Sequence, residues 1–155
     1  MKILLFFIFV LTSCGKPIFK SNAIKKPELE FSQASNNFWP EINKDFEINF
    51  INKPQIGLNS KFDISFFPPG SSVEEKLSEK FCVLLWMVMP NGSQHGSSPM
   101  DISYNSVSKK YEIDEVYFLM PGIWQIRMRT IDSTQVCSPL INSSYLSEHI
   151  IEISI

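Results

Sequence analysis

The amino-acid sequence predicts an all-β fold, an antiparallel β-sandwich of about seven short strands. Apolar and polar side chains alternate in several short segments, and turn residues separate these segments at intervals of about ten residues. Residues 15–43 sustain neither the period of a strand nor that of a helix. The chain has 155 residues, 44% of them hydrophobic, which is enough for one domain with a single core.

The first two expected strands are half-buried. Residues 46–50 place three apolar side chains on one face with polar residues between them, and residues 62–66 repeat this pattern. Residues 71–79 are polar and allow one helical turn at most. The next strand, residues 81–89, is apolar on both faces, so we expect it to be central or covered on both sides.

Four later strands complete the expected sandwich, at residues 100–104, 110–119, 123–130 and 148–155. Pro121 and Gly122 suit a tight turn between the second and third of these, with Gly122 at positive φ. Trp124 shares a face with Ile126 and Met128, and we expect it to be the large side chain at the centre of the core.

The amino terminus has the pattern of an export signal. Lys2 precedes an apolar run, residues 3–11, which is far shorter than the roughly 20 residues needed to span a bilayer. Leu11, Thr12, Ser13 and Cys14 then resemble the lipobox of bacterial lipoproteins. The resemblance implies cleavage before Cys14, lipidation of its thiol and acylation, as with palmitate, of the new amino terminus. The alternatives are a plain secretory signal or a short buried strand.

The expected organisation is a signal peptide (1–13), a lipid-anchored tether (14–43) and one β-sandwich domain (44–155). The tether contains prolines and lysines without a regular period, and Phe38 and Trp39 are expected to dock onto the domain. Gly15 follows the cysteine, where inner-membrane lipoproteins of diderm bacteria usually have Asp. By this analogy we expect the lipid anchor to lie in the outer membrane and the domain to face the periplasm.

The charge balance and the motifs exclude several function classes. Fourteen basic residues against sixteen acidic ones provide no basic field for nucleic acid. His95 and Ser97 are a base and a hydroxyl without a residue to orient them, and the chain contains no nucleophile-elbow, P-loop or Rossmann motif. We therefore expect a protein that is not an enzyme.

Two segments resemble a known family. They are Met89-Pro90 followed by His95-Gly96-Ser97-Ser98-Pro99, and Tyr117 to Trp124 with its Met120-Pro121-Gly122. Together they resemble the YtkA-like family, related to the FixH proteins, over about residues 44–130. The resemblance implies an immunoglobulin-like sandwich of the bacterial envelope and a non-catalytic accessory or binding role toward an envelope protein. The chain departs from the family where Gly92, Ser93 and Gln94 replace a second Met and its Gly.

A second hypothesis is copper handling. His95 lies among three methionines at expected strand ends, Met89, Met100 and Met120, and thioethers with an imidazole select Cu(I). The alternative is that these methionines fill the core and His95 is solvated, in which case no cofactor is expected.

Two cysteines remain besides Cys14. In an exported protein Cys82 and Cys137 can form a disulfide, which would close a loop of about 55 residues and contribute about 4 kcal/mol. The alternative is two separate buried thiols.

Overall fold

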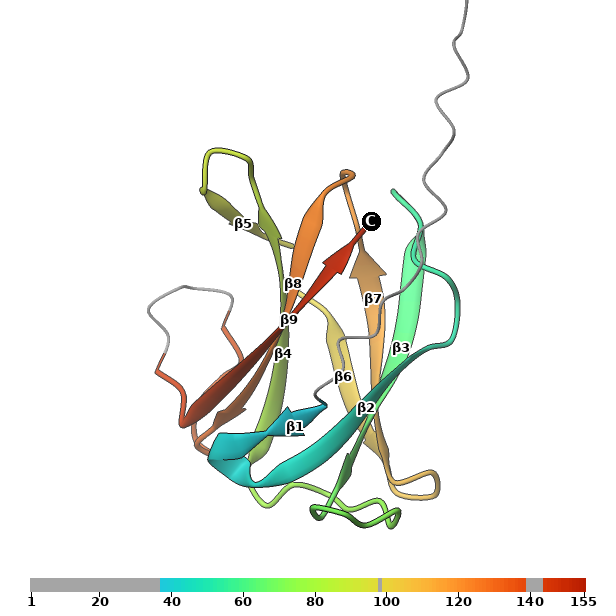
Figure 1. Ribbon diagram of the computed structural model, residues 1–155, viewed down its shortest axis with the longest axis vertical. Coiled ribbons are helices and arrows are strands. Elements are labelled where there is room, and N and C mark those ends of the chain that lie inside the picture. The colour runs from blue at the N-terminus through green and yellow to red at the C-terminus, as the bar shows by residue number, and fades with distance from the viewer. Residues whose placement is uncertain (1–36, 98, 139–143) are drawn as a thin grey trace, which may run out of the picture.

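The computed structural model describes residues 37–97, 99–138 and 144–155 (Figure 1). The expected signal peptide, Cys14 and most of the expected tether lie outside these residues. The described chain is all-β, with one short 3₁₀ turn, η1 (Pro40–Ile42), and no α-helix. Within the described ranges, no helix is long and apolar enough to cross a membrane.

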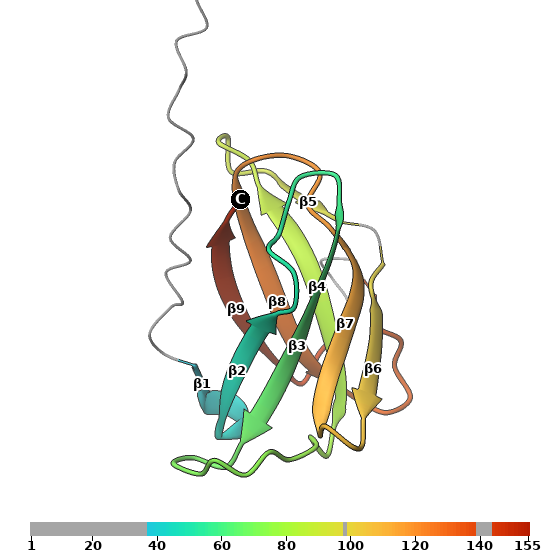
Figure 2. The same cartoon turned by 90° about the vertical axis from the view of Figure 1, so that its right-hand side faces the viewer.

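The strands form two antiparallel sheets. In order across the first sheet, the strands are β1 (Phe38–Trp39), β2 (Lys44–Phe50), β3 (Asn59–Phe67), β7 (Lys110–Tyr117) and β6 (Asp101–Asn105). Those of the second are β5 (Gln94–Gly96), β4 (Lys80–Val88), β8 (Ile123–Ile131) and β9 (Ser147–Ser154). Figure 2 shows the two sheets facing each other.

The core lies between the sheets, as the alternation predicts. Phe62, Ile64 and Phe66 of β3 are fully buried against Trp124, Ile126 and Met128 of β8 and the inward residues of β4. Trp124 is 2% exposed, which confirms its expected position. Gly122 has a φ of 147°, a backbone conformation that favours glycine, and a Cβ there would lie 2.9 Å from Cε of Met87, so that side chain would have to move as well.

Strand β4 is buried on both faces, as expected. Its outward residues Cys82, Leu84 and Trp86 form a second apolar cluster with Ile131, and Cys137 packs against this cluster. The β8–β9 connection therefore covers part of the outer face of the second sheet. A strand in the middle of a sheet with cover on each side needs apolar side chains at every position.

The structure corrects the expected strand list in three places. It contains two short strands, β1 and β5, that the periodicity does not show, because two or three residues are too few to display a period. Strand β1 lies before Lys44, within the expected tether, and pairs with β2, and Trp39 is completely buried, in agreement with its expected docking onto the domain. Strand β7 ends at Tyr117, two residues before the expected end.

A β-bulge changes which residues of β7 face the core. Tyr111 and Ile113 are buried, and after Glu115, whose φ is 59°, the buried residues are Val116 and Phe118. The pairing with β3 shifts register at the same place, between Ser60 and Phe62. The one extra residue moves the side chains that face the core from odd-numbered to even-numbered positions. After Glu115, the even-numbered apolar side chains therefore face the core and the odd-numbered ones face the solvent.

Candidate functional site

Three connections between strands lie at one end of the molecule. They are the β2–β3 loop (51–58), the β7–β8 turn (118–122) and the tip of the β4–β5 hairpin (89–93), all at the upper end in Figures 1 and 2. The pairing agrees with this placement, because the last residue of β4, Val88, pairs with the first residue of β8, Ile123.

Exposed apolar side chains concentrate at this end. Of the fourteen large hydrophobic side chains that are exposed in the described part of the chain, seven belong to the β2–β3 loop and the segment 117–123. They are each 37–59% exposed, and the other seven are distributed over five other segments. We name this surface the apolar pole and define it by its seven residues, Ile51, Ile56, Leu58, Tyr117, Leu119, Met120 and Ile123.

The apolar pole carries almost no charge. Lys53 is the only charged side chain in residues 51–58 and 117–123, and residues 89–93 of the neighbouring hairpin contain none. The acidic residues of β7 nearest to the pole are Glu115, which is exposed, and Asp114, whose Oδ2 lies 3.0 Å from Nζ of Lys61. The backbone N–H of Glu115 and this lysine lower the pKa of Asp114, so its charge is stabilised below the pole by local partners.

Backbone hydrogen bonds hold the β2–β3 loop in place. The N–H of Gly57 donates to the carbonyl of Phe118 at 2.8 Å and so joins the two apolar segments. Asn52 ties the loop to β3, because its side-chain oxygen accepts from the N–H of Lys61 at 2.7 Å and its amide donates to the carbonyl of Asn59 at 2.9 Å. A loop fixed in this way cannot easily turn its apolar side chains inward.

Trp124 supports the β7–β8 turn from below. Its indole N–H donates to the carbonyl of Met120 at 3.0 Å, and its ring meets the buried ring of Phe118 edge-on, with centroids 5.4 Å apart. The core side chain therefore fixes the backbone that displays Leu119 and Met120 at the surface.

The structure separates the residues of the copper hypothesis. His95 is exposed on β5 and lies across from Met87, while Met89 follows β4 at the pole and Met120 belongs to the apolar pole. Met100 lies elsewhere, in the wall of a cavity of about 310 Å³ between β4 and the segment 97–102. His95 and Met89 thus share a hairpin, Met89 and Met120 share one end of the β4–β8 pair, and Met100 does not join them.

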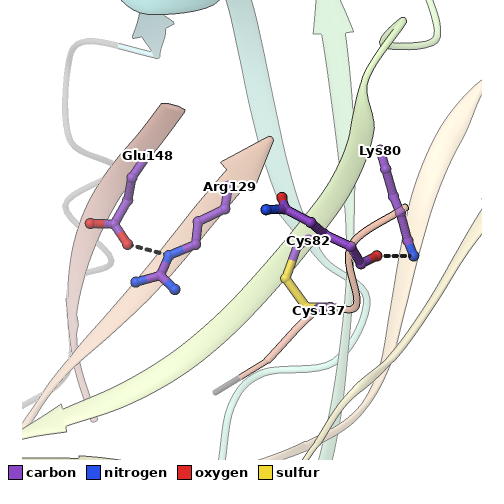
Figure 3. Close-up of a disulfide and its surroundings, with 6 residues drawn as sticks. Lys80, Cys82, Arg129, Cys137 and Glu148 are labelled. Carbon is purple, nitrogen blue, oxygen red and sulfur yellow. Dashed lines mark hydrogen bonds and ion pairs between the residues drawn. A yellow bond between two sulfur atoms is a disulfide. The ribbon is translucent and has the colours of Figure 1, made fainter. Parts of the chain in front are cut away.

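Cys82 and Cys137 form a disulfide, with their Cα atoms 5.6 Å apart and a sequence separation of 55 residues (Figure 3). Of the two alternatives that the sequence leaves open, the structure contains the bridge. Lys80 adds a second link between the same segments by donating from Nζ to the carbonyl of Gln135 at 2.7 Å. The bridge fixes the β8–β9 connection to the outer face of β4.

Two arginines of β8 cover the rest of that outer face. The Arg127 guanidinium lies over the ring of Trp86, 5.2 Å from its centroid. Arg129 pairs with Glu148 at 2.6 Å, as Figure 3 shows, and lies over the ring of Tyr145. These contacts bury both guanidinium groups against their own sheet, so we assign the two arginines a structural role.

Among the described residues no group of three or more His, Cys, Asp or Glu side chains is arranged to hold a metal ion.

The sequence reasoning missed the apolar pole. It identified the Pro121-Gly122 turn and Met120, yet it did not identify the surrounding residues as a surface. The available signal was the absence of charge, because residues 116–126 contain no charged side chain although they include a turn. Turns are usually polar, so an uncharged apolar turn indicates a contact surface.

No family model, curated protein or solved structure matches the chain.

Proposed function

We propose that this chain is a lipid-anchored protein of the bacterial envelope whose domain, YtkA-like and immunoglobulin-like in type, is a non-catalytic binding module. In this proposal Cys14 carries the lipid, and the domain faces the periplasm from the outer membrane. The apolar pole binds another component of the envelope, for example an envelope protein. The lipobox resemblance supports the anchor. The Pro121-Gly122 turn and the buried Trp124 support the family resemblance.

The observation that carries the binding role is the concentration of exposed apolar side chains at one end. Leaving Leu119, Ile56 and Leu58 half-exposed in water costs free energy, because each forgoes part of the roughly 1.5–3 kcal/mol that burial of such a side chain contributes. Large apolar patches on soluble domains typically mark interaction surfaces. The hydrogen bonds that hold both segments outward make a collapsed alternative costly.

Photocrosslinking in cells tests this function. The full chain carries a photoreactive benzoylphenylalanine in place of Leu119, and a matched control carries it in place of Val107, which is 93% exposed in the β6–β7 turn at the other end of the domain. We expect a crosslinked adduct from position 119 and none from position 107. Equal adducts from both positions, or none from 119, would contradict a binding role for the pole.

Labelled palmitate tests the anchor in the same cells. The wild-type chain should incorporate the label, and Cys14→Ser should not. Incorporation that is unchanged by Cys14→Ser would place the lipid elsewhere or exclude the anchor.

Copper handling remains the second candidate, favoured by the position of Met89 and Met120 at the same end of the β4–β8 pair. In this reading His95 is the essential ligand. Titration of the reduced chain with Cu(I) against a competing chelator should then give weaker binding for His95→Ala than for wild type, and equal affinity would end this candidate.

A further inference from the structure

The side-chain composition of the apolar pole favours one class of binding partner over another. Five of its seven residues are aliphatic, beside Met120 and the single aromatic Tyr117, whereas protein interfaces are enriched in aromatic side chains, methionine and arginine. The charged side chains nearest in sequence are Lys61 on β3 and Asp114 and Glu115 on β7; Lys61 and Asp114 pair with each other, and Glu115 is exposed beside the pole. The surface therefore presents apolar groups and one cation, Lys53, with no acidic side chain among them.

From this composition we infer that the apolar pole docks on the surface of a phospholipid bilayer with anionic headgroups. The aliphatic side chains of Ile56, Leu58 and Leu119 enter the boundary between headgroups and acyl chains, and the Lys53 ammonium pairs with lipid phosphate. Acidic side chains at this position would be repelled by such a surface, and the pole contains none. The inference rests on the proposed binding role and identifies the bound component.

The backbone arrangement suits this docking. Turns and loops can enter a headgroup region only if their polar backbone groups have partners, because an unpaired group in an apolar medium is costly. The N–H groups of Ile51, Gly57 and Leu58 all donate within the protein, to Lys61, Phe118 and Gln55. Gly122 is likewise paired in both directions with Ile155. The pole thus presents side chains while much of its backbone is already satisfied.

The length of the preceding chain permits the lipid anchor and the pole to reach the same bilayer. The described chain enters the fold at β1, which pairs with the start of β2, and β2 then leads into the β2–β3 loop. The seven residues of β2 cover about 23 Å. Residues 15–36, when extended, span up to about 70 Å. Cys14 can therefore insert its lipid into the membrane on which the pole rests.

Lipid crosslinking in defined vesicles tests the inference. The full acylated chain, with benzoylphenylalanine in place of Leu119 or of Val107, is reconstituted into vesicles of phosphatidylethanolamine with phosphatidylglycerol, and separately into phosphatidylcholine vesicles. Mass spectrometry of the digested protein then measures phospholipid adducts at each position. We expect position 119 to give an adduct yield at least about tenfold above position 107 in the anionic vesicles.

Lys53→Glu, combined with the photoreactive residue at 119, tests the electrostatic part. Lys53 is exposed and forms no ion pair with another residue of the described chain. We therefore expect the variant to fold and its adduct yield in anionic vesicles to fall toward the yield in phosphatidylcholine. Equal yields at positions 119 and 107 would overturn the lipid inference. If position 119 captures a protein in cells but no lipid in vesicles, the binding module stands and the lipid inference is wrong. If it captures neither, both are wrong.

Discussion

Trp124 connects the core to the apolar pole through a single side chain. It fills the space beside Phe118 and donates a hydrogen bond to the backbone of Met120. Trp124→Ala should lower the free energy of unfolding by about 3–5 kcal/mol, because a large aromatic side chain leaves a cavity. Circular dichroism melts and urea unfolding measure this. Trp124→Phe is the matched control, which keeps most of the apolar volume and should cost less. An unchanged midpoint for the alanine variant would place the indole outside the core.

His149 predicts a pH dependence of stability. Its ring lies 5.1 Å from Phe46 and 5.9 Å from Trp39, and burial lowers its pKa below the ordinary value of 6.5, while Glu41 opposes the shift. The unfolded chain therefore binds more protons than the folded one just below pH 6.5. The stability that this histidine supports is present in full above pH 6.5 and is lost as the pH falls through the folded pKa.

Thermal melts between pH 5 and 8 measure that effect. We expect the melting temperature of the wild type to fall toward pH 5, and His149→Phe to remove much of this slope. Asp114 and Asp132 also have lowered pKa values, but their contribution is lost only at more acid pH, below about 4, so they do not overlap this range. The same slope in both proteins would show that another group is responsible.

At the scale of elements, the Cys82–Cys137 disulfide attaches a long connection to a central strand. It links β4 to the segment after β8 across 55 residues, over an apolar cluster that this segment helps to cover. Its loss should lower the free energy of unfolding by about 4 kcal/mol in the chain-entropy model. Cys82→Ser with Cys137→Ser, and the wild type with and without reductant, measure this by urea unfolding. If reduction leaves the urea midpoint unchanged, the bridge does not contribute.

The sequence predicts the longer elements well and the short ones poorly. Alternation identifies β2, β3, β8 and β9, and the double apolar face identifies β4 as buried on both sides, because periodicity is a local property. β1 and β5 consist of two and three residues, and they are strands only because a neighbouring strand offers hydrogen-bond partners. The β-bulge at Glu115 likewise depends on the pairing of β7 with β3.

At the scale of the whole molecule, Trp39 determines where the folded domain begins. It lies before the expected boundary at residue 44, and, as expected of a docking residue, it is completely buried, with its ring tilted against that of Phe66 at 6.3 Å. A chain that starts at Asn37 should unfold at the same urea concentration as the full chain. A chain that starts at Lys44 should lose about 3–5 kcal/mol, because it loses this indole and β1. Equal midpoints for the two truncated chains would mean that β1 and Trp39 do not contribute to the fold.

By itself, the sequence determined that this chain is all-β, which faces of its longer strands are buried, and that Trp124 belongs to the core. These properties follow from the spacing of neighbouring side chains. Only the tertiary structure decided that Cys82 meets Cys137, that Met100 lines a cavity beside β4, and that the β2–β3 loop and the β7–β8 turn, with their exposed apolar side chains, lie at one end of the molecule. These are contacts between residues far apart in the chain, and the course of the backbone, including a one-residue bulge, sets which side chains meet and which remain in water.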